Sequence, residues 1–200
     1  MNKISIKNIF KQFDQNIIID NQSFNLEAGI YRLAGNNGTG KSTLLNILGG
    51  IDSDFQGEVS IDRNNLLFLD DKDIGLNPFT IKENILILMK LFKIPSTSTT
   101  DKIIKDFFDG KEDLRYSQAS VGTKMKVGLI LILLKNWDII LLDESFSTID
   151  TKSRQLIVDK LLSLKEKAII IYVAHSEVDE RLTSVATKLE LKAGKLYVEK

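Results

Sequence analysis

The opening third of the chain alternates apolar and polar residues in short runs, and this spacing is typical of strands. Residues 1–10, Met-Asn-Lys-Ile-Ser-Ile-Lys-Asn-Ile-Phe, show it clearly. Glycines then separate several of the runs, as expected where a chain turns. Strands are therefore predicted at residues 4–7, 17–20, 30–34, 57–62 and 66–69.

Farther along, the apolar residues recur at helical spacing. Ile81, Ile85, Leu88 and Phe92 lie three or four positions apart and predict a helix that starts near Thr80. Other helices are predicted at 42–48, about 103–108, 120–134 and 154–165. Gly49 and Gly50 would end the first of these, and Thr100 or Asp101 would cap the second.

Two short apolar runs, at 139–142 and 169–173, are bounded by polar residues. Runs that are apolar at every position fit strands buried on both faces of a parallel sheet. Together with the helices between the strands, they predict an α/β sheet domain with a helical insert at about 76–133.

Charge and composition narrow the functional classes. The 27 basic residues balance 27 acidic residues, so nucleic acid is not expected as a partner, because nonspecific binding to phosphates depends on excess Lys and Arg. No cysteine is present, which excludes disulfides and thiolate chemistry. The longest apolar run, 127–134, is far shorter than the roughly 20 residues of a membrane-spanning helix, so we expect no such helix.

A glycine-rich segment between the predicted strand 30–34 and the helix 42–48 fits the phosphate-binding loop, or Walker A pattern. Glycines let backbone N–H groups approach phosphate oxygens, and the helix N-terminus adds a positive dipole end. In such loops the lysine reaches the β- and γ-phosphates and the hydroxyl residue ligates Mg²⁺. The alternative is a glycine-rich turn that matches by accident. The candidate ligand-binding residues are Gly35, Asn36, Asn37, Gly38, Thr39, Gly40, Lys41, Ser42 and Thr43.

Asp143 and Glu144 follow directly on the apolar run 139–142. Asp143 at the tip of the strand is suited to hold Mg²⁺, and Glu144 to polarise a water for attack on the γ-phosphate. Taken alone, two acidic residues at a strand end are commonplace, because strands end at solvent. After a phosphate-binding loop, they indicate a nucleotide-hydrolysing enzyme.

The segment from Ala119 to Leu129 resembles the signature of the ATP-binding cassette (ABC) family, Leu-Ser-Gly-Gly-Gln followed by an apolar helix. Ser120 and Gly122 keep the hydroxyl and one glycine, whereas Ala119, Val121 and Thr123 depart from it. The resemblance implies that this helix N-terminus meets the nucleotide of a partner subunit. The plainer alternative is an N-capped amphipathic helix.

Several further residues resemble conserved positions of that family. His175, the single histidine, resembles the switch histidine that touches the γ-phosphate, and Asp150 resembles a dimer-interface aspartate. Phe13 resembles the aromatic that stacks on adenine, although a half-buried strand aromatic explains it nearly as well. Two positions depart: Ser145 replaces the usual proline, and Asp71, or alternatively Asp70, replaces a glutamine that couples Mg²⁺ to the insert. An ionised carboxylate only accepts hydrogen bonds, whereas glutamine also donates.

The resemblance covers essentially the whole chain and implies one ABC ATPase domain over residues 1–200. Its fold would be a P-loop NTPase (RecA-like) α/β core with an N-terminal antiparallel β region and an inserted helical subdomain. Implied cofactors are ATP and Mg²⁺, with Ser42, Asp143 and Asp71 as metal ligands and Glu144, His175 and Lys41 as catalytic residues.

Implied partners are a transmembrane transporter subunit and a second ATP-binding domain, identical or different. The implied location is cytoplasmic, peripheral on the inner face of the cell membrane. The spacing of Lys124 and Lys126 in the signature leans towards export. The alternatives are a soluble ABC ATPase without a transport role, or an impaired ATP-binding subunit paired with a more active partner.

Overall fold

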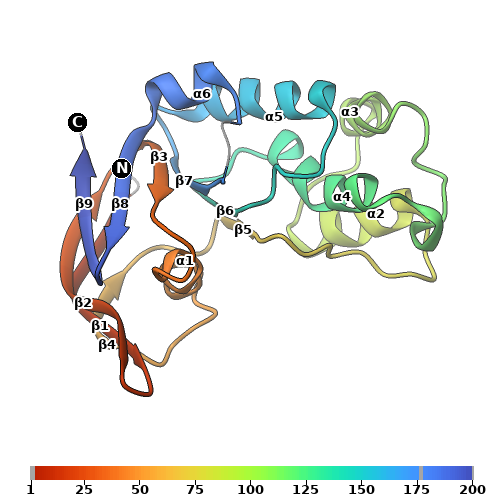
Figure 1. Cartoon of the computed structure of the whole chain (residues 1–200). Coiled ribbons are helices and arrows are strands. Elements are labelled where there is room, and N and C mark those ends of the chain that lie inside the picture. Colours follow the sequence, from red (N-terminus) through yellow and green to blue (C-terminus); the bar gives the residue numbers. More distant parts are fainter. Residues whose placement is uncertain (1–2, 176–177, 200) are drawn as a thin grey trace. The chain divides into compact units, whose positions relative to one another are not determined.

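The computed structural model describes residues 3–175 and 178–199, which divide into two compact units (Figure 1). The first unit contains Met1–Phe68, Trp137–Glu144 and Leu162–Lys200, and the second contains Leu69–Asn136 and Ser145–Leu161. The strands are β1 (Ile4–Phe13), β2 (Asn16–Leu26), β3 (Gly29–Ala34), β4 (Gln56–Ser60), β5 (Leu66–Leu69), β6 (Ile139–Asp143), β7 (Ile169–Val173), β8 (Thr187–Lys192) and β9 (Lys195–Glu199). The helices are α1 (Lys41–Gly49), α2 (Ile81–Leu91), α3 (Ser98–Phe108), the 3₁₀ turn η1 (Tyr116–Gln118), α4 (Val121–Leu134), α5 (Thr151–Leu164) and α6 (Glu180–Val185).

The described strands form two sheets, and the antiparallel one lies in the N-terminal region, as the family resemblance implies. An antiparallel sheet has the order β2-β1-β4, and a six-stranded sheet has the order β5-β6-β7-β3-β8-β9. In the larger sheet β6, β7, β3 and β8 run parallel, and β9 returns antiparallel to β8. The turn between β8 and β9 is made by Ala193 and Gly194, both with positive φ. The predicted α/β class and the predicted parallel strands are therefore confirmed.

The core of the first unit explains the spacing of apolar residues in β6 and β7. All residues of both strands are buried, but every second one, beginning with Ile139 and Ile169, belongs to the cluster that includes α1. Successive side chains of a strand point to opposite faces, so the remaining residues pack on the other face of the sheet. Burying a side chain of this size contributes about 1.5–3 kcal/mol. The two strands are thereby held in register with their carboxyl ends at one edge of the sheet.

The second unit is built around α4, which packs against α2 and α3. Residues 125–132 of α4 are buried without interruption, as in a helix that is apolar on all sides. Among residues 3–175 and 178–199, no helix combines the length and the apolar character that a membrane span needs.

The prediction for the start of α3 is wrong. The helix begins at Ser98 and is capped by Thr97, not by Thr100 or Asp101. Thr97 Oγ1 accepts a hydrogen bond from the Thr100 N–H at 3.2 Å, and Thr100 Oγ1 accepts one from the Thr97 N–H at 2.8 Å. This reciprocal capping box extends the helix towards its N-terminus, into a stretch rich in serine and threonine. The short helix α6 was not predicted at all.

Candidate nucleotide-binding and hydrolysis site

The glycine-rich segment forms the loop between β3 and α1, where its pattern requires it. Lys41 is the first residue of α1, and its side chain is buried. Its ammonium group donates hydrogen bonds to the backbone oxygens of Gly35, at 2.9 Å, and Asn36, at 3.0 Å. The positive charge is therefore held over the loop, where a phosphate bound by the loop amides would lie within reach.

Two glycines of the loop are required by positive φ and close contacts, at Gly40 with a side chain and at Gly35 with backbone. A Cβ atom at Gly40, which has φ +98°, would lie 2.3 Å from Ile18 Cγ2. At Gly35, which has φ +148°, it would lie 2.5 Å from the backbone oxygen of Leu191. Both φ values are ones that only glycine adopts easily. The loop thus passes too close to β2 and β8 for any other residue.

The N-terminus of α1 opens on a cavity of about 490 Å³. Gly40 at the N-cap supplies no side chain to the first N–H groups of the helix, and no acidic residue lies in its first turn. Such a helix end attracts anions through its N–H groups and its dipole. The cavity is lined by Phe13, Ile18, Asn37, Gly38, Gly40, Lys41, Ser42, Thr43, Glu144 and His175.

Glu144 and His175 come from the carboxyl ends of neighbouring strands, β6 and β7, and meet at this cavity. His175 Nε2 lies 2.6 Å from Glu144 Oε1. The Glu144 N–H donates to the backbone oxygen of Val173 at 3.1 Å, and Glu144 has φ +56°. A left-handed backbone at a residue other than glycine costs about 1–3 kcal/mol and persists where the surrounding structure enforces it. The pair places a carboxylate, steadied by an imidazole, opposite the phosphate-binding loop.

The residues expected to hold Mg²⁺ differ in their surroundings. Asp143 is the last residue of β6 and is buried, and Ser42 lines the cavity. Carboxylate and hydroxyl oxygens are the ligands that Mg²⁺ prefers, usually together with phosphate oxygens and water, so these two fit the ion. Asp71 follows β5 in the second unit and is exposed.

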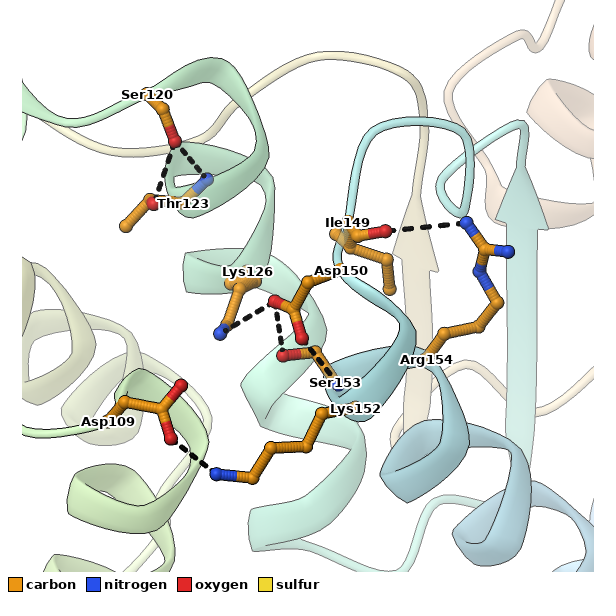
Figure 2. Close-up of polar contacts among 9 residues, drawn as sticks. All are labelled: Asp109, Ser120, Thr123, Lys126, Ile149, Asp150, Lys152, Ser153 and Arg154. Atoms are coloured by element: carbon orange, nitrogen blue, oxygen red, sulfur yellow. Dashed lines mark hydrogen bonds and ion pairs between the residues drawn. The ribbon is translucent and has the colours of Figure 1, made fainter.

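In the second unit, Ser120 caps the N-terminus of α4 (Figure 2). Its Oγ accepts a hydrogen bond from the Thr123 N–H at 3.2 Å and lies 2.9 Å from Thr123 Oγ1. A Cβ atom at Gly122 would lie 2.4 Å from the backbone oxygen of Thr148. Gly122 is thus required for the close approach of α4 to the segment that follows Glu144.

Comparison with known proteins identifies the arrangement of these motifs. The sequence profile described as "ABC transporter" matches residues 19–147, well over half of the chain. The chain belongs to the ABC transporter family. Members of this family are ATPases, and the phosphate-binding loop and the Asp143–Glu144 pair both fall within the matched segment.

Relatives and solved structures agree with this assignment. An aliphatic sulfonates import ATP-binding protein of Bacillus cereus is 30% identical, over 97% of this chain and 84% of the relative. An ABC transporter ATP-binding protein of Methanocaldococcus jannaschii is 33% identical, over 96% and 75%. The structure of a bacterial Atm1-family ABC exporter with ATP bound has a TM-score of 0.79 at 25% identity, over 98% of this chain and 38% of the exporter. An ATP-binding subunit of an ABC transporter has a TM-score of 0.81 at 18% identity, over 96% and 87%, and shares the fold.

Two departures from the ABC pattern have structural counterparts. Ser145, at the position usually taken by proline, is fully buried, and its hydroxyl donates to the backbone oxygens of Leu69, at 2.9 Å, and Asp70, at 3.2 Å. It therefore anchors the segment that leads into Asp71. Val121, at a position usually taken by glycine, is 66% exposed at the N-terminus of α4.

Asp150 of this ABC domain is part of a polar network within the second unit (Figure 2). The Ser153 N–H and hydroxyl donate to its carboxylate, each at 2.8 Å, and the Lys126 ammonium lies 3.2 Å from Oδ2. Burial alone would raise the pKa of Asp150, but these hydrogen bonds and the ion pair lower it to about 2. Nearby, Lys152 pairs with Asp109. The network ties the start of α5 to α4 and α3.

Some of these residues could not be found from sequence patterns. Ile18 lines the cavity although nothing marks it among other strand residues. Lys126 is buried, and its ammonium lies 4.8 Å from the ring centroid of Phe107. In the sequence, Lys126 is only one of two lysines in the signature segment. Its place directly before the apolar run 127–134 was the one sign that it could be buried.

Proposed function

We propose that the cavity of the first unit binds ATP with Mg²⁺ and hydrolyses it. The observation that carries this proposal is the common cavity of the phosphate-binding loop, Glu144 and His175. The loop N–H groups and Lys41 bind the β- and γ-phosphates, and Phe13 provides an apolar ring for the adenine. Ser42 and Asp143 would hold Mg²⁺, and the ion would supply positive charge to the phosphates. Nucleotide-binding residues are Phe13, Gly35, Asn36, Asn37, Gly38, Thr39, Gly40, Lys41, Ser42 and Thr43.

In the hydrolytic step Glu144 accepts the proton of a water whose oxygen attacks the γ-phosphorus. The bond between that phosphorus and the bridging oxygen to the β-phosphate breaks, and ADP and phosphate leave. His175 holds the Glu144 carboxylate through the contact at 2.6 Å and so restricts the direction from which the water approaches. Lys41 neutralises charge on the leaving ADP.

We further propose that two such domains close around ATP, each presenting its α4 N-terminus to the other's nucleotide. Support comes from the second unit: Ser120 and Gly122 lie at the first turn of α4, and Val121 beside them is exposed. A helix N-terminus with a hydroxyl is suited to a phosphate oxygen. In this arrangement Asp150 would lie at the interface. The γ-phosphate would complete that interface, so that ATP favours the closed pair and hydrolysis releases it.

The transmembrane partner would dock on the second unit. Exposed apolar side chains occur on α2, at Ile87 and Leu91, which lie one helical turn apart, and in the segment before α2, at Ile74, Leu76 and Phe79. We propose that the partner covers these side chains, because exposed apolar surface that forms one patch marks an interaction site. The proposed setting is cytoplasmic, on the inner face of the membrane.

Export is the direction we propose, from the lysine spacing of the signature and from the similarity to the ATP-bound exporter. The relatives include proteins named for import of sulfonates and for export of Nod factor, so the direction needs its own transport assay in sealed vesicles of both orientations.

ATP turnover tests the hydrolytic assignment. Glu144→Gln should abolish turnover and retain ATP binding, whereas Glu58→Gln, at an exposed carboxylate on β4, should change neither. Purification of the tagged chain from a mild detergent extract should bring down a membrane protein that raises the turnover of the wild type. Unchanged turnover in Glu144→Gln would refute the assigned role.

A second candidate is an ATP-binding subunit with impaired hydrolysis that works beside a more active partner. Val121 and Thr123 in the signature and the carboxylate at Asp71 favour it. It predicts that the wild-type chain binds ATP but turns it over no faster than Glu144→Gln, both alone and with its membrane partner.

A further inference from the structure

Lys11 is a buried cation in the antiparallel sheet of the first unit. It lies on β1, two residues before Phe13, and is only 3% exposed. A lysine is almost never buried this deeply unless its charge is paired. Its ammonium group therefore needs partners that define where it lies.

Those partners are two carboxylates from the segment between α1 and β4. Lys11 Nζ lies 3.0 Å from Asp52 Oδ2 and 3.3 Å from Asp54 Oδ2, and it also donates to the backbone oxygen of Asp54. The Asp54 N–H donates to Asp52 Oδ1 at 2.9 Å, which holds the two residues together. Burial lowers the pKa of Lys11, but the hydrogen bonds to both carboxylates outweigh it and raise the pKa above its ordinary value. The side chain is thus a fixed positive charge.

The same ammonium lies 4.7 Å from the centroid of the Phe13 ring, over its face. This is the geometry of a cation–π contact. Phe13 is 49% exposed and lines the nucleotide cavity, whereas Lys11 lines a different cavity of about 360 Å³ together with Asp54 and Phe55. Since the ammonium covers one ring face, a ligand has only the other face on which to stack.

We propose that Lys11 is a positioning residue for nucleotide binding, which fixes the Phe13 ring so that its uncovered face receives the base. Phe13 is the last residue of β1 and is followed by the turn at Asp14, which has φ +51°. A half-exposed ring at a strand end has rotamer freedom that base stacking would have to remove, and the ammonium removes it in advance. The contact also withdraws π-electron density from the ring, which favours an electron-rich purine. This inference rests on the proposed function.

The test compares a ligand that has a base with one that lacks it. Dissociation constants are measured by calorimetry for ATP and for inorganic tripolyphosphate, both with Mg²⁺. Lys11→Met is expected to weaken ATP binding by about 3- to 10-fold, from the usual strength of a cation–π contact, and to leave tripolyphosphate binding within about twofold. Lys7→Met removes an exposed lysine of the same strand, which lies 3.9 Å from Glu58, and should change neither constant.

The coupling to Phe13 gives a second readout. In a Phe13→Leu background, Lys11→Met should produce no further loss of ATP affinity, because the ring through which Lys11 acts is absent. If Lys11→Met does not fold, the double variant Lys11→Met with Asp52→Asn is used, because it does not leave the Asp52 carboxylate without its ion-pair partner. The double variant should likewise weaken ATP binding about 3- to 10-fold and leave tripolyphosphate binding within about twofold. Asp54, whose side chain is 98% exposed, can remain hydrated.

Equal weakening of ATP and tripolyphosphate would show that Lys11 only supports the fold, and it would overturn the proposal. Unchanged ATP binding in Lys11→Met would overturn it as well, but would leave the proposed function standing. Failure of the wild-type protein to bind either ligand would instead refute the proposed function, and this inference with it.

Discussion

Two glycines of the phosphate-binding loop should respond very differently to the same added methyl group. Gly38 has φ +78° and Gly40 has φ +98°, so alanine pays a similar backbone cost of about 1–2 kcal/mol at each. The surroundings differ. A Cβ at Gly38 meets nothing within 4 Å among the residues that the structure describes, whereas one at Gly40 would lie 2.3 Å from Ile18 Cγ2.

Relief of the contact at Gly40 requires movement of Ile18, whose branched side chain is stiff at χ1. Overpacking of this kind costs about 1–3 kcal/mol. Gly40→Ala should therefore lower the free energy of unfolding by about 2–5 kcal/mol, and Gly38→Ala by about 1–2 kcal/mol. A difference of about 2 kcal/mol corresponds to roughly 4–8 °C in Tm for a chain of this size.

Urea unfolding measures this difference. The single tryptophan, Trp137, is buried in the first unit, so its fluorescence reports on the unit that contains the loop. The wild type, Gly38→Ala and Gly40→Ala are compared at the same pH and salt. Equal losses for the two variants, or an unaffected Gly40→Ala, would refute the contact between the loop and β2 on which the reasoning depends.

Two other substitutions test the second unit. Gly122→Ala would bring a methyl to 2.4 Å from the backbone oxygen of Thr148, which cannot rotate away, so we expect a loss of about 1–3 kcal/mol by thermal unfolding. Ala119→Gly, which creates no clash, should cost only about 0.4–1 kcal/mol through the entropy of the unfolded chain. Asp150→Asn removes a carboxylate that is 50% exposed and has a pKa near 2, and solvent screening reduces its contribution to about 1 kcal/mol at pH 7. Because the folded pKa lies below the unfolded one, this contribution is complete above about pH 5 and is lost as the pH falls towards 2. Urea titrations from pH 3 to 7 measure the free energy of unfolding of Asp150→Asn and of the wild type. The difference between the two free energies should become smaller at low pH, and a difference that does not change with pH would contradict the ion-pair account.

The sequence predicted those parts of the fold that depend on local pattern. The parallel strands β6 and β7 were found because burial on both faces demands apolar residues at every position. The phosphate-binding loop was found because the close contacts at Gly35 and Gly40 demand glycine. Both are cases in which a single physical requirement restricts the residue type strongly.

Two kinds of feature were out of reach: the choice among equivalent local residues, and contacts between residues distant in the chain. The cap of α3 was misplaced because Thr97 and Thr100 act as a pair, and any of several serines and threonines nearby could have capped the helix. Lys11 is an ordinary strand lysine until Asp52 and Asp54, some forty residues later, surround its ammonium. Ser145 likewise departs from the family pattern without any hint in the sequence that its hydroxyl binds the backbone at Leu69.

The central claim is that ATP is held at the loop and hydrolysed with Glu144 as base, in a pair of domains that ATP closes. Light scattering of purified Glu144→Gln with Mg²⁺ measures this most directly. We predict a dimer with ATP and a monomer with ADP or without nucleotide. A monomer under all three conditions, with ATP demonstrably bound, would contradict the account.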